Sequence, residues 1–380
     1  MTASRAERCI IFTANRGYAL RSSRCLLIRK FAEADWNVVL ATADDQDSRS
    51  LCDLGARLES VAFRRGGIAL KSDISAYRRL RQIYRKYQPN LIQQFHAKPA
   101  IFGSLAARRA LEDAVRVVNT ITGLGQAFVQ GGLSSRLAGL GYRSASRKTD
   151  ITVFQNRDDH RFFLEQGWVN ESNSRVILSS GVDLGYFEEV DRNWGPRDEL
   201  VVLMLGRLLR QKGVPEFVEV ASRIRRLVPQ ARFVVAGEED MGHPDAVSRE
   251  WLDSRDDVEY LGRLADVRPA LAKADLLLFP SYYREGVPRV ILEASATGLP
   301  VVAYDVPGVR DVVGDGETGF LVPEGNVEAL ARGVRTLLED ETLRRKMGRA
   351  ARSLMERSFD VRDVTQQYLD VYRDLGVVNF

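Results

Sequence analysis

Short apolar runs alternate with amphipathic stretches throughout this chain, and the alternation restarts near the middle. The first series contains the runs Arg8–Ala14, Trp36–Thr42, Asn90–Phe95, Val115–Thr120, Asp150–Gln155 and Arg175–Leu178. The second contains Leu200–Leu205, Ala231–Ala236, Val258–Leu261, Asp275–Phe279 and Pro300–Tyr304. Such runs predict buried parallel strands, and helical segments between them predict right-handed crossovers. We therefore expect an α/β protein with two Rossmann-like domains.

The boundary between the two series falls at the turn Ser179–Asp183. It predicts a first domain at residues 1–183 and a second at 184–360. The segment 361–380 is expected to form a closing helix that packs back toward the first domain. A length of 380 residues suits two domains of ordinary size. Because open α/β sheets bind ligands at the carboxyl ends of their strands, we expect the two sheets to face an interdomain cleft.

Composition and motifs predict a cytoplasmic protein without a dinucleotide cofactor. Cys9, Cys25 and Cys52 are odd in number and lack metal-ligand spacing, which favours reduced thiols. No apolar run approaches the roughly 20 residues that span a bilayer, and no signal peptide is apparent at the N-terminus. Neither opening strand is followed by the Gly-x-Gly-x-x-Gly pattern of dinucleotide sites.

The run Asp275–Phe279 leads into a polar turn and then a helix associated with two glutamates. Pro288 suits the first turn of this helix, because its missing N–H would have no partner there. Glu285 precedes the helix, and Glu293 lies two turns inside it, within about 80° of the same direction. The helix start favours a phosphate, and the carboxylates favour hydroxyl groups. A nucleotide-sugar combines these features, whereas two solvated glutamates are the alternative explanation.

A cationic turn follows the first strand of the second series, in the sequence Gly206-Arg207-Leu-Leu-Arg-Gln-Lys212-Gly213. Arginine can clamp a phosphate through two parallel N–H bonds, while lysine provides a mobile charge. We expect Arg207 and Lys212 to neutralise a diphosphate as the anomeric C–O bond of a sugar breaks. Preorganised donors stabilise that charge most in the transition state. A solvated basic turn is the alternative.

Charge and histidine content single out the first domain. Between Ile74 and Thr149 the sequence has thirteen basic residues and only two acids, Glu112 and Asp113. Within this window, Phe128–Lys148 combines apolar residues and glycines with purely basic charge, which is typical of a segment resting on an anionic membrane surface. A partly buried helix-loop is equally compatible with it. His96, one of three histidines, follows the strand Asn90–Phe95 and is expected to contact a sugar hydroxyl or phosphate, with a structural turn histidine as the alternative.

These motifs together resemble the retaining GT-B glycosyltransferases of family four. Glu285-Gly-Val-Pro-Arg-Val-Ile-Leu-Glu293 is similar to their E-x7-E motif. Further matches are Gly206–Gly213, Ser180–Asp183, Pro307-Gly308 and Thr318–Pro323. Phe95–Pro99 and Thr120–Gly125 resemble a narrower group, the CapM-like and PglA-like transferases, which extend sugars on undecaprenyl diphosphate. The resemblance covers nearly the whole chain.

The resemblance implies a metal-independent transferase whose UDP-sugar donor is a substrate, with no cofactor. It implies catalytic roles for Glu285, His96, Arg207 and Lys212. Donor contacts are expected at Arg207, Lys212, Gly262, Arg263, Leu264, Glu285, Gly286, Val287, Pro288 and Glu293. Contacts to the acceptor, a lipid-linked (undecaprenyl diphosphate) saccharide of capsule, exopolysaccharide or protein-glycan assembly, are expected at Asn15, Arg16, Gly17, His96, Lys98, Thr122 and Gly123. One departure is Asn15-Arg16-Gly17, which replaces paired glycines common in the family.

Other functions remain open at this point. A transferase with a soluble acceptor has the same motifs. A UDP-sugar 2-epimerase would need more acid–base groups than one well-placed histidine. A nucleic-acid binder would need aromatic stacking platforms, which the basic window does not interleave. Asp45-Gln46-Asp47, in the acidic loop 44–47, formally matches a metal-binding D-x-D sequence, but no metal partner stands out nearby. We therefore expect no metal and no nucleic acid, and a peripheral location on the inner face of the bacterial inner membrane.

Overall fold

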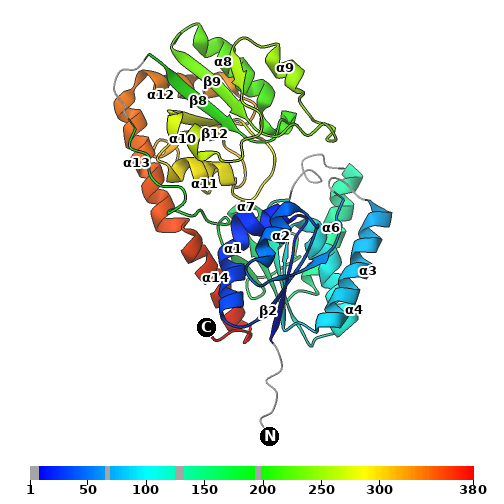
Figure 1. Cartoon of the computed structure of the whole chain (residues 1–380). Helices are drawn as coiled ribbons and strands as arrows, with labels where there is room; N and C mark the ends of the chain where they lie inside the picture. The colour runs from blue at the N-terminus through cyan, green and yellow to red at the C-terminus, as the bar shows by residue number, and fades with distance from the viewer. Residues whose placement is uncertain (1–7, 65–68, 125–131, 193–197) are drawn as a thin grey trace. The chain divides into compact units, whose positions relative to one another are not determined.

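The computed structural model describes residues 8–64, 69–124, 132–192 and 198–380. The chain divides into two compact units, each described by itself below (Figure 1). The first comprises residues 1–181, 284–286 and 361–380, and the second comprises residues 182–283 and 287–360.

The first unit is built on a parallel sheet of seven strands. These are β1 (Cys9–Thr13), β2 (Asn37–Thr42), β3 (Arg57–Ser60), β4 (Leu91–Phe95), β5 (Arg116–Ile121), β6 (Ile151–Phe154) and β7 (Ser174–Val176). Their order is β3-β2-β1-β4-β5-β6-β7. In the register, Ile10 of β1 pairs with Val38 of β2 and with Leu91 of β4. The strand order reverses between β1 and β4, which is where open α/β sheets bind ligands.

Alternate residues of the buried strands face two helical layers. Ile10 and Phe12 of β1 pack with α1 (Gly17–Glu33), α2 (Gln46–Cys52) and α14 (Val361–Asp374). Cys9 and Ile11 face the other layer, which contains α3 (Leu70–Tyr87) and α4 (Ser104–Leu111). The short helix η1 (Pro99–Gly103) and α6 (Gly132–Ser146) adjoin α4, and α7 (Arg157–Glu165) follows β6. The sheet is therefore covered on both faces, as a parallel sheet requires.

The second unit repeats this plan with six parallel strands. These are β8 (Leu200–Leu205), β9 (Ala231–Ala236), β10 (Val258–Tyr260), β11 (Leu276–Phe279), β12 (Val301–Tyr304) and β13 (Gly319–Val322), in the order β10-β9-β8-β11-β12-β13. The helices α8 (Val214–Arg225) and α12 (Val327–Glu339) pack together on one face. The other face carries α10 (Arg268–Lys273), α11 (Arg289–Ala296) and α13 (Glu341–Ser358). Two short helices, η2 (Arg210–Lys212) and α9 (Arg249–Asp253), lie in the connections.

The predicted fold class is confirmed, and the differences from expectation are local. The prediction of an acidic loop at 44–47 is wrong, because α2 begins at Gln46. Asp45 caps this helix by accepting a hydrogen bond from the Ser48 N–H at 2.8 Å. Pro288 lies just before α11 as its cap residue and not in the first turn, with φ −65° and ψ 122°. None of the helices in the described ranges is long and apolar enough to cross a membrane.

Candidate functional site

In the second unit, Arg207 lies at the carboxyl edge of the sheet, directly after β8. Its Nη1 is 3.0 Å from Oδ2 of Asp240, which follows β9. The two loops approach so closely that a Cβ on Gly237 would come 1.6 Å from the Gly206 carbonyl oxygen. Glycine is therefore required at position 237. The ion pair holds Arg207 in a partly exposed position, so its other N–H groups are available for an anion.

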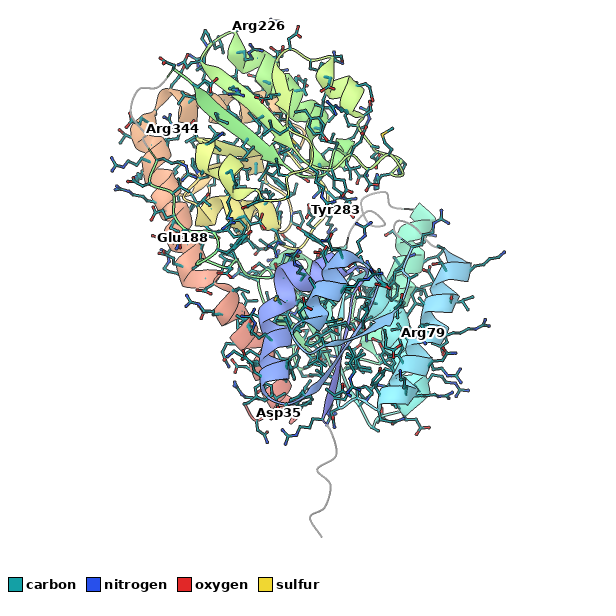
Figure 2. The ribbon with its side chains drawn as sticks, viewed as in Figure 1. Asp35, Arg79, Glu188, Arg226, Tyr283 and Arg344 are labelled. Carbon is teal, nitrogen blue, oxygen red and sulfur yellow. The ribbon has the colours of Figure 1, made fainter. Side chains whose placement is uncertain are left out.

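Lys212 ends the turn η2 at the same edge. Its Nζ lies 5.9 Å from the ring centroid of Phe279, the last residue of β11, and 5.3 Å from that of Tyr283 (Figure 2 labels Tyr283). Gly213 follows with φ 84°, and a Cβ there would come 2.2 Å from the Pro280 carbonyl oxygen. The turn after β8 is thus locked against the turn after β11, and these two strands flank the point where the strand order reverses.

Two further predicted donor segments lie in this unit. Val287 and Pro288 lead into α11, and the start of a helix favours an anion. Gly262, which precedes Arg263 and Leu264, follows β10 and accepts a hydrogen bond from the Gly237 N–H at 2.9 Å. Glu293 is mostly buried, and its Oε1 accepts from Nη2 of Arg289 at 2.8 Å. A ribose contact by Glu293 would therefore share this carboxylate with Arg289.

In the first unit, Asn15, Arg16 and Gly17 connect β1 to α1. The Gly17 N–H donates to Oδ2 of Asp45 at 3.0 Å, and a Cβ on Gly17 would come 2.2 Å from Oδ1 of the same residue. The start of α1 is thus already capped by a carboxylate of the protein. Asp45 and Asp47 also bond elsewhere, to Ser48 and Arg21, which supports a structural role for Asp45-Gln46-Asp47.

His96 and Lys98 follow β4, and the structure gives them different environments. His96 has φ 74°, in the left-handed region, and its buried Nδ1 has no partner within the described ranges. Burial lowers the pKa of His96 to about 4, and the nearby Arg24 charge acts in the same direction, so its imidazole is neutral. Lys98 instead forms an ion pair of 2.8 Å with the buried Asp73, so its charge is already compensated.

Thr122 and Gly123, after β5, lie against the segment Arg284–Gly286, which belongs to the first unit. The Gly286 N–H donates to the Thr122 carbonyl at 2.8 Å. Gly123 has φ 110°, and a Cβ there would come 2.4 Å from the Glu285 carbonyl carbon. Nδ2 of Asn156 donates to the Glu285 carbonyl at 3.2 Å. The backbone of Glu285 and Gly286 is therefore fixed by the loops that follow β5 and β6.

A buried ion pair completes this anchor. Arg284 donates to Oδ1 of Asp159 through Nε at 3.0 Å and pairs through Nη2 at 2.9 Å. Oδ2 of Asp159, whose side chain is fully buried, accepts from Nδ2 of Asn156 at 2.9 Å. Burial raises the pKa of Asp159, and the Arg284 charge opposes that rise.

Asp159, Asn156 and Arg284 are absent from the predicted site. The helix-capping pair Asn156 and Asp159 after the run Asp150–Gln155 was the available signal. Backbone and ring contacts group Arg207, Lys212 and Gly262 at one sheet edge, and Val287–Pro288 follow β11 of the same sheet. It places Glu285 and Gly286 with the first unit.

The basic window is partly neutralised by acids from outside it. Arg79, which projects from α3 (Figure 2), and Lys86 both pair with Glu59 of β3, each at 2.6 Å. Arg108 and Arg116 pair with Asp150 at 2.8 and 2.9 Å. With Lys98, five of the thirteen bases thus have acidic partners that the window does not contain. The sequence imbalance therefore overstates the local charge.

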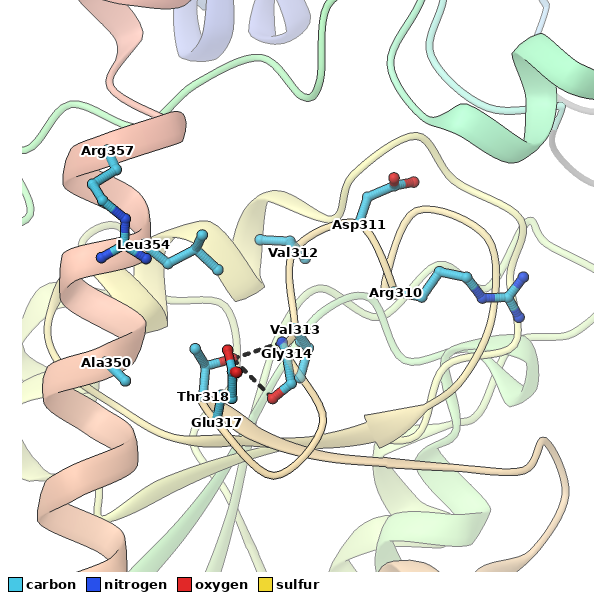
Figure 3. A pocket seen from close by; sticks show the side chains of 10 residues that line it. All are labelled: Arg310, Asp311, Val312, Val313, Gly314, Glu317, Thr318, Ala350, Leu354 and Arg357. Carbon is cyan, nitrogen blue, oxygen red and sulfur yellow. Dashed lines mark hydrogen bonds between the residues drawn. The ribbon is translucent and has the colours of Figure 1, made fainter.

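A cavity of about 230 Å³ lies between the loop that joins β12 to β13 and helix α13 (Figure 3). Val312 and Leu354 provide apolar wall, and Glu317 and Arg357 provide charges of opposite sign. Among the described residues that line it, none belongs to the predicted site. The described side chains also contain no group of three or more His, Cys, Asp or Glu that could hold a metal ion.

Comparison with known proteins identifies the family. The model described as Glycosyl transferases group 1 matches residues 187–354, and the one described as Glycosyl transferase 4-like matches residues 9–156. An N,N'-diacetylbacillosaminyl-diphospho-undecaprenol alpha-1,3-N-acetylgalactosaminyltransferase of Campylobacter jejuni is 27% identical over 376 residues, which are 95% of this chain and 97% of that protein. A UDP-Gal:alpha-D-GlcNAc-diphosphoundecaprenol alpha-1,3-galactosyltransferase of Escherichia coli is 25% identical over 325 residues, 82% of each chain.

A solved structure shares the fold. HepE of Anabaena, in complex with UDP and glucose, superposes with a TM-score of 0.77 at 20% identity, covering 97% of this chain and 100% of that one. The two family models together span most of the sequence. The chain therefore contains a 4-like glycosyltransferase domain and a group 1 glycosyltransferase domain and has the GT-B fold.

Proposed function

We propose that this enzyme transfers a hexose or N-acetylhexosamine from a UDP-sugar, with retention, to a saccharide on undecaprenyl diphosphate. The observation that carries the proposal is that Arg207 and Lys212 follow β8 while α11 follows β11, the two strands between which the order of the second sheet reverses. Two cations and a helix start suit a diphosphate. UDP in the HepE complex and UDP-Gal in the name of the Escherichia coli relative support a uridine nucleotide.

The residues divide the work of transfer between leaving group and sugar. Arg207 and Lys212 stabilise the charge that develops on UDP as the anomeric bond breaks. Glu285 contacts the donor sugar, Glu293 the ribose, and Gly262–Leu264 the base. No carboxylate is assigned as a covalent nucleophile, so the acceptor hydroxyl attacks the anomeric carbon from the face that UDP leaves, and its proton passes to the departing diphosphate oxygen. The group 1 match supports retention, and the mechanism needs no metal or further cofactor.

The acceptor assignment is supported by the relatives. Both named relatives act, by their names, on sugars linked to undecaprenol through a diphosphate. We assign acceptor contacts to the loops of the first unit that contain Asn15, Arg16 and Gly17, His96, Lys98, and Thr122 and Gly123. Such an acceptor belongs to capsule, exopolysaccharide or protein-glycan assembly.

A membrane-surface location is supported by one face of α6. Arg136, Leu140 and Arg143 recur at helical spacing, Arg147 follows in the turn after the helix, and all four are exposed. Leu140 is 61% exposed and its neighbour Leu137 is 44% exposed. Exposed leucines between arginines suit the boundary between anionic headgroups and acyl chains. We propose that this face holds the enzyme peripherally on the inner leaflet of the inner membrane.

The test is a donor screen in which free UDP and labelled lipid are measured with undecaprenyl diphosphate-linked saccharides present. We expect UDP release to depend on the lipid acceptor and to persist in EDTA. Arg207→Ala should lower turnover by about 10²–10³-fold, the cost of losing one preorganised donor. Arg210→Ala removes an exposed charge from the same turn and serves as the matched control, with turnover near that of wild type.

Other outcomes identify the competing functions. Transfer to free saccharides but not to the lipid would assign a soluble acceptor. Formation of an epimer from the UDP-sugar alone would assign an epimerase. A strict metal requirement would contradict the proposed mechanism.

A further inference from the structure

Arg24, on the inner face of α1, is a buried cation without an acid beside it in the described parts of the chain. The residue is 4% exposed. Its guanidinium carbon lies 4.6 Å from the ring centroid of Phe95 and 4.7 Å from that of Tyr368. It makes no hydrogen bond or ion pair with any described residue, and its Nε is buried without a partner. A guanidinium removed from water in this way is costly unless an anion balances it.

The polar residues around Arg24 do not provide that anion. The Tyr372 hydroxyl donates to Oε1 of Gln93 at 2.7 Å, and Nε2 of Gln93 donates to Oγ1 of Thr120 at 3.0 Å. The hydroxyls of Thr120 and Tyr368 lie 3.2 Å apart. Burial raises the pKa of Tyr372 well above 10, so this network stays neutral. The polar groups satisfy one another and leave the charge of Arg24 uncompensated.

Two more polar atoms without partners lie at this sheet edge. His96, directly after Phe95, has its buried Nδ1 unpaired within the described ranges, and its φ of 74° is strained for a residue with a side chain. Oδ1 of Asn15, after β1, is also buried and unpaired there. β1 and β4 are the strands between which the order reverses. Asn15 and His96 thus follow the two strands where the fold places ligands, and Arg24 lies against Phe95, the residue before His96.

We propose that Arg24 and His96 form an anion site that binds a phosphate, and that this phosphate belongs to the diphosphate of the lipid-linked acceptor. Guanidinium and phosphate match in charge and in donor geometry. A neutral His96 adds hydrogen bonding without requiring a second charge. The anion site follows from the unpaired groups alone, whereas the identity of its ligand depends on the function proposed above.

The first experiment measures binding of inorganic pyrophosphate to the full chain by calorimetry. Arg207→Gln and Lys212→Gln are introduced throughout, so that the cationic turn of the second unit does not bind the probe. Arg24→Met keeps apolar contact with both rings and removes the charge. We expect it to weaken pyrophosphate binding at least tenfold. Arg29→Gln removes an exposed charge from the same helix and should leave binding unchanged.

A purely structural role for Arg24 predicts different results. If Arg24 is an uncompensated buried charge, Arg24→Met should keep or raise Tm. If Arg24 is needed for its cation–π contacts with the two rings, Arg24→Met should lower Tm. Equal pyrophosphate affinity in Arg24→Met and its parent would overturn the site. Failure of both Arg24→Met and Arg24→Gln to fold would also overturn it, by assigning Arg24 to the structure.

The second experiment identifies the source of the phosphate, in enzyme with Arg207 and Lys212 intact. We expect Arg24→Met to raise KM for the lipid-linked acceptor at least tenfold while KM for the UDP-sugar stays the same. A rise in KM for the donor instead would overturn the acceptor assignment. If wild-type enzyme transfers nothing to the lipid but binds pyrophosphate through Arg24, the proposed function fails and the anion site stands.

Discussion

The carboxylate of Asp159 is fully buried and has two partners, Arg284 and Asn156. Arg284→Met would leave it with Asn156 alone, and losing one partner of a buried ion pair typically costs about 3–5 kcal/mol. We expect a loss of that size in the free energy of unfolding at neutral pH, measured by urea denaturation. Arg332→Met, which breaks an exposed pair with Glu328, is the control and should cost less than about 1 kcal/mol.

The pH dependence of this loss tests its cause. Burial already raises the pKa of Asp159, and removing Arg284 removes the charge that opposes the rise. A carboxyl with a raised folded-state pKa is least destabilising when it is protonated, so the deficit of Arg284→Met should shrink as the pH falls. A deficit that is constant with pH would attribute the loss to packing.

His96 makes a second pH-dependent contribution to the free energy of unfolding, because its pKa in the folded chain is about 4 against an ordinary value of 6.5. The unfolded chain takes up a proton at His96 as the pH falls below about 6.5, and the folded chain does so only near the lower value. Wild-type stability should therefore decrease between these two pH values more steeply than that of His96→Gln. Urea denaturation of both proteins over this range measures the difference, and parallel curves would contradict a neutral, buried imidazole.

At the scale of elements, the sequence predicted the strands that are buried on both faces. Leu276–Phe279 and Ala231–Ala236 are apolar runs closed by a polar turn or glycine, which is why their positions agree with the structure within a residue. The strand β3, with the sequence Arg-Leu-Glu-Ser, was not predicted, because an edge strand contains few apolar residues. The helix α2 was not predicted, because its cap residue, Asp45, is equally typical of a turn.

The exposed face of α6 carries the prediction that belongs to this scale. Arg136→Glu, Arg143→Glu and Arg147→Glu together should abolish most of the binding to vesicles of anionic lipid, because each basic residue near the surface contributes about 1 kcal/mol. Cosedimentation with vesicles measures it. The control reverses Arg345, Lys346 and Arg349, exposed residues of α13, and changes net charge by the same amount. An equal loss of vesicle binding in both variants would show that the effect comes from net charge and not from this face of α6.

For the whole molecule, the local sequence predicted candidate loops for the chemistry but not the residues that fix the positions of those loops. The position of Arg207 and Lys212 at the carboxyl end of a strand could be predicted because glycines and an apolar run flank them in sequence. The Asp159–Arg284 pair could not, since its members are 125 residues apart and neither belongs to a periodic pattern. The partners of the basic window were missed for the same reason, because Glu59 and Asp150 meet it only through the sheet.

The division into two units predicts which segments donor binding protects from amide hydrogen exchange. A ligand that binds only the folded state stabilises it by about 2.7 kcal/mol at 100 times its Kd. We expect UDP to slow amide hydrogen exchange at Gly206–Gly213, Gly262–Leu264 and Val287–Ile291 of the second unit. UDP-sugar should add protection at Glu285 and Gly286, whose backbone the first unit holds. Arg207→Ala should remove both effects. Protection by UDP that is confined to the first unit would contradict a donor site in the second unit.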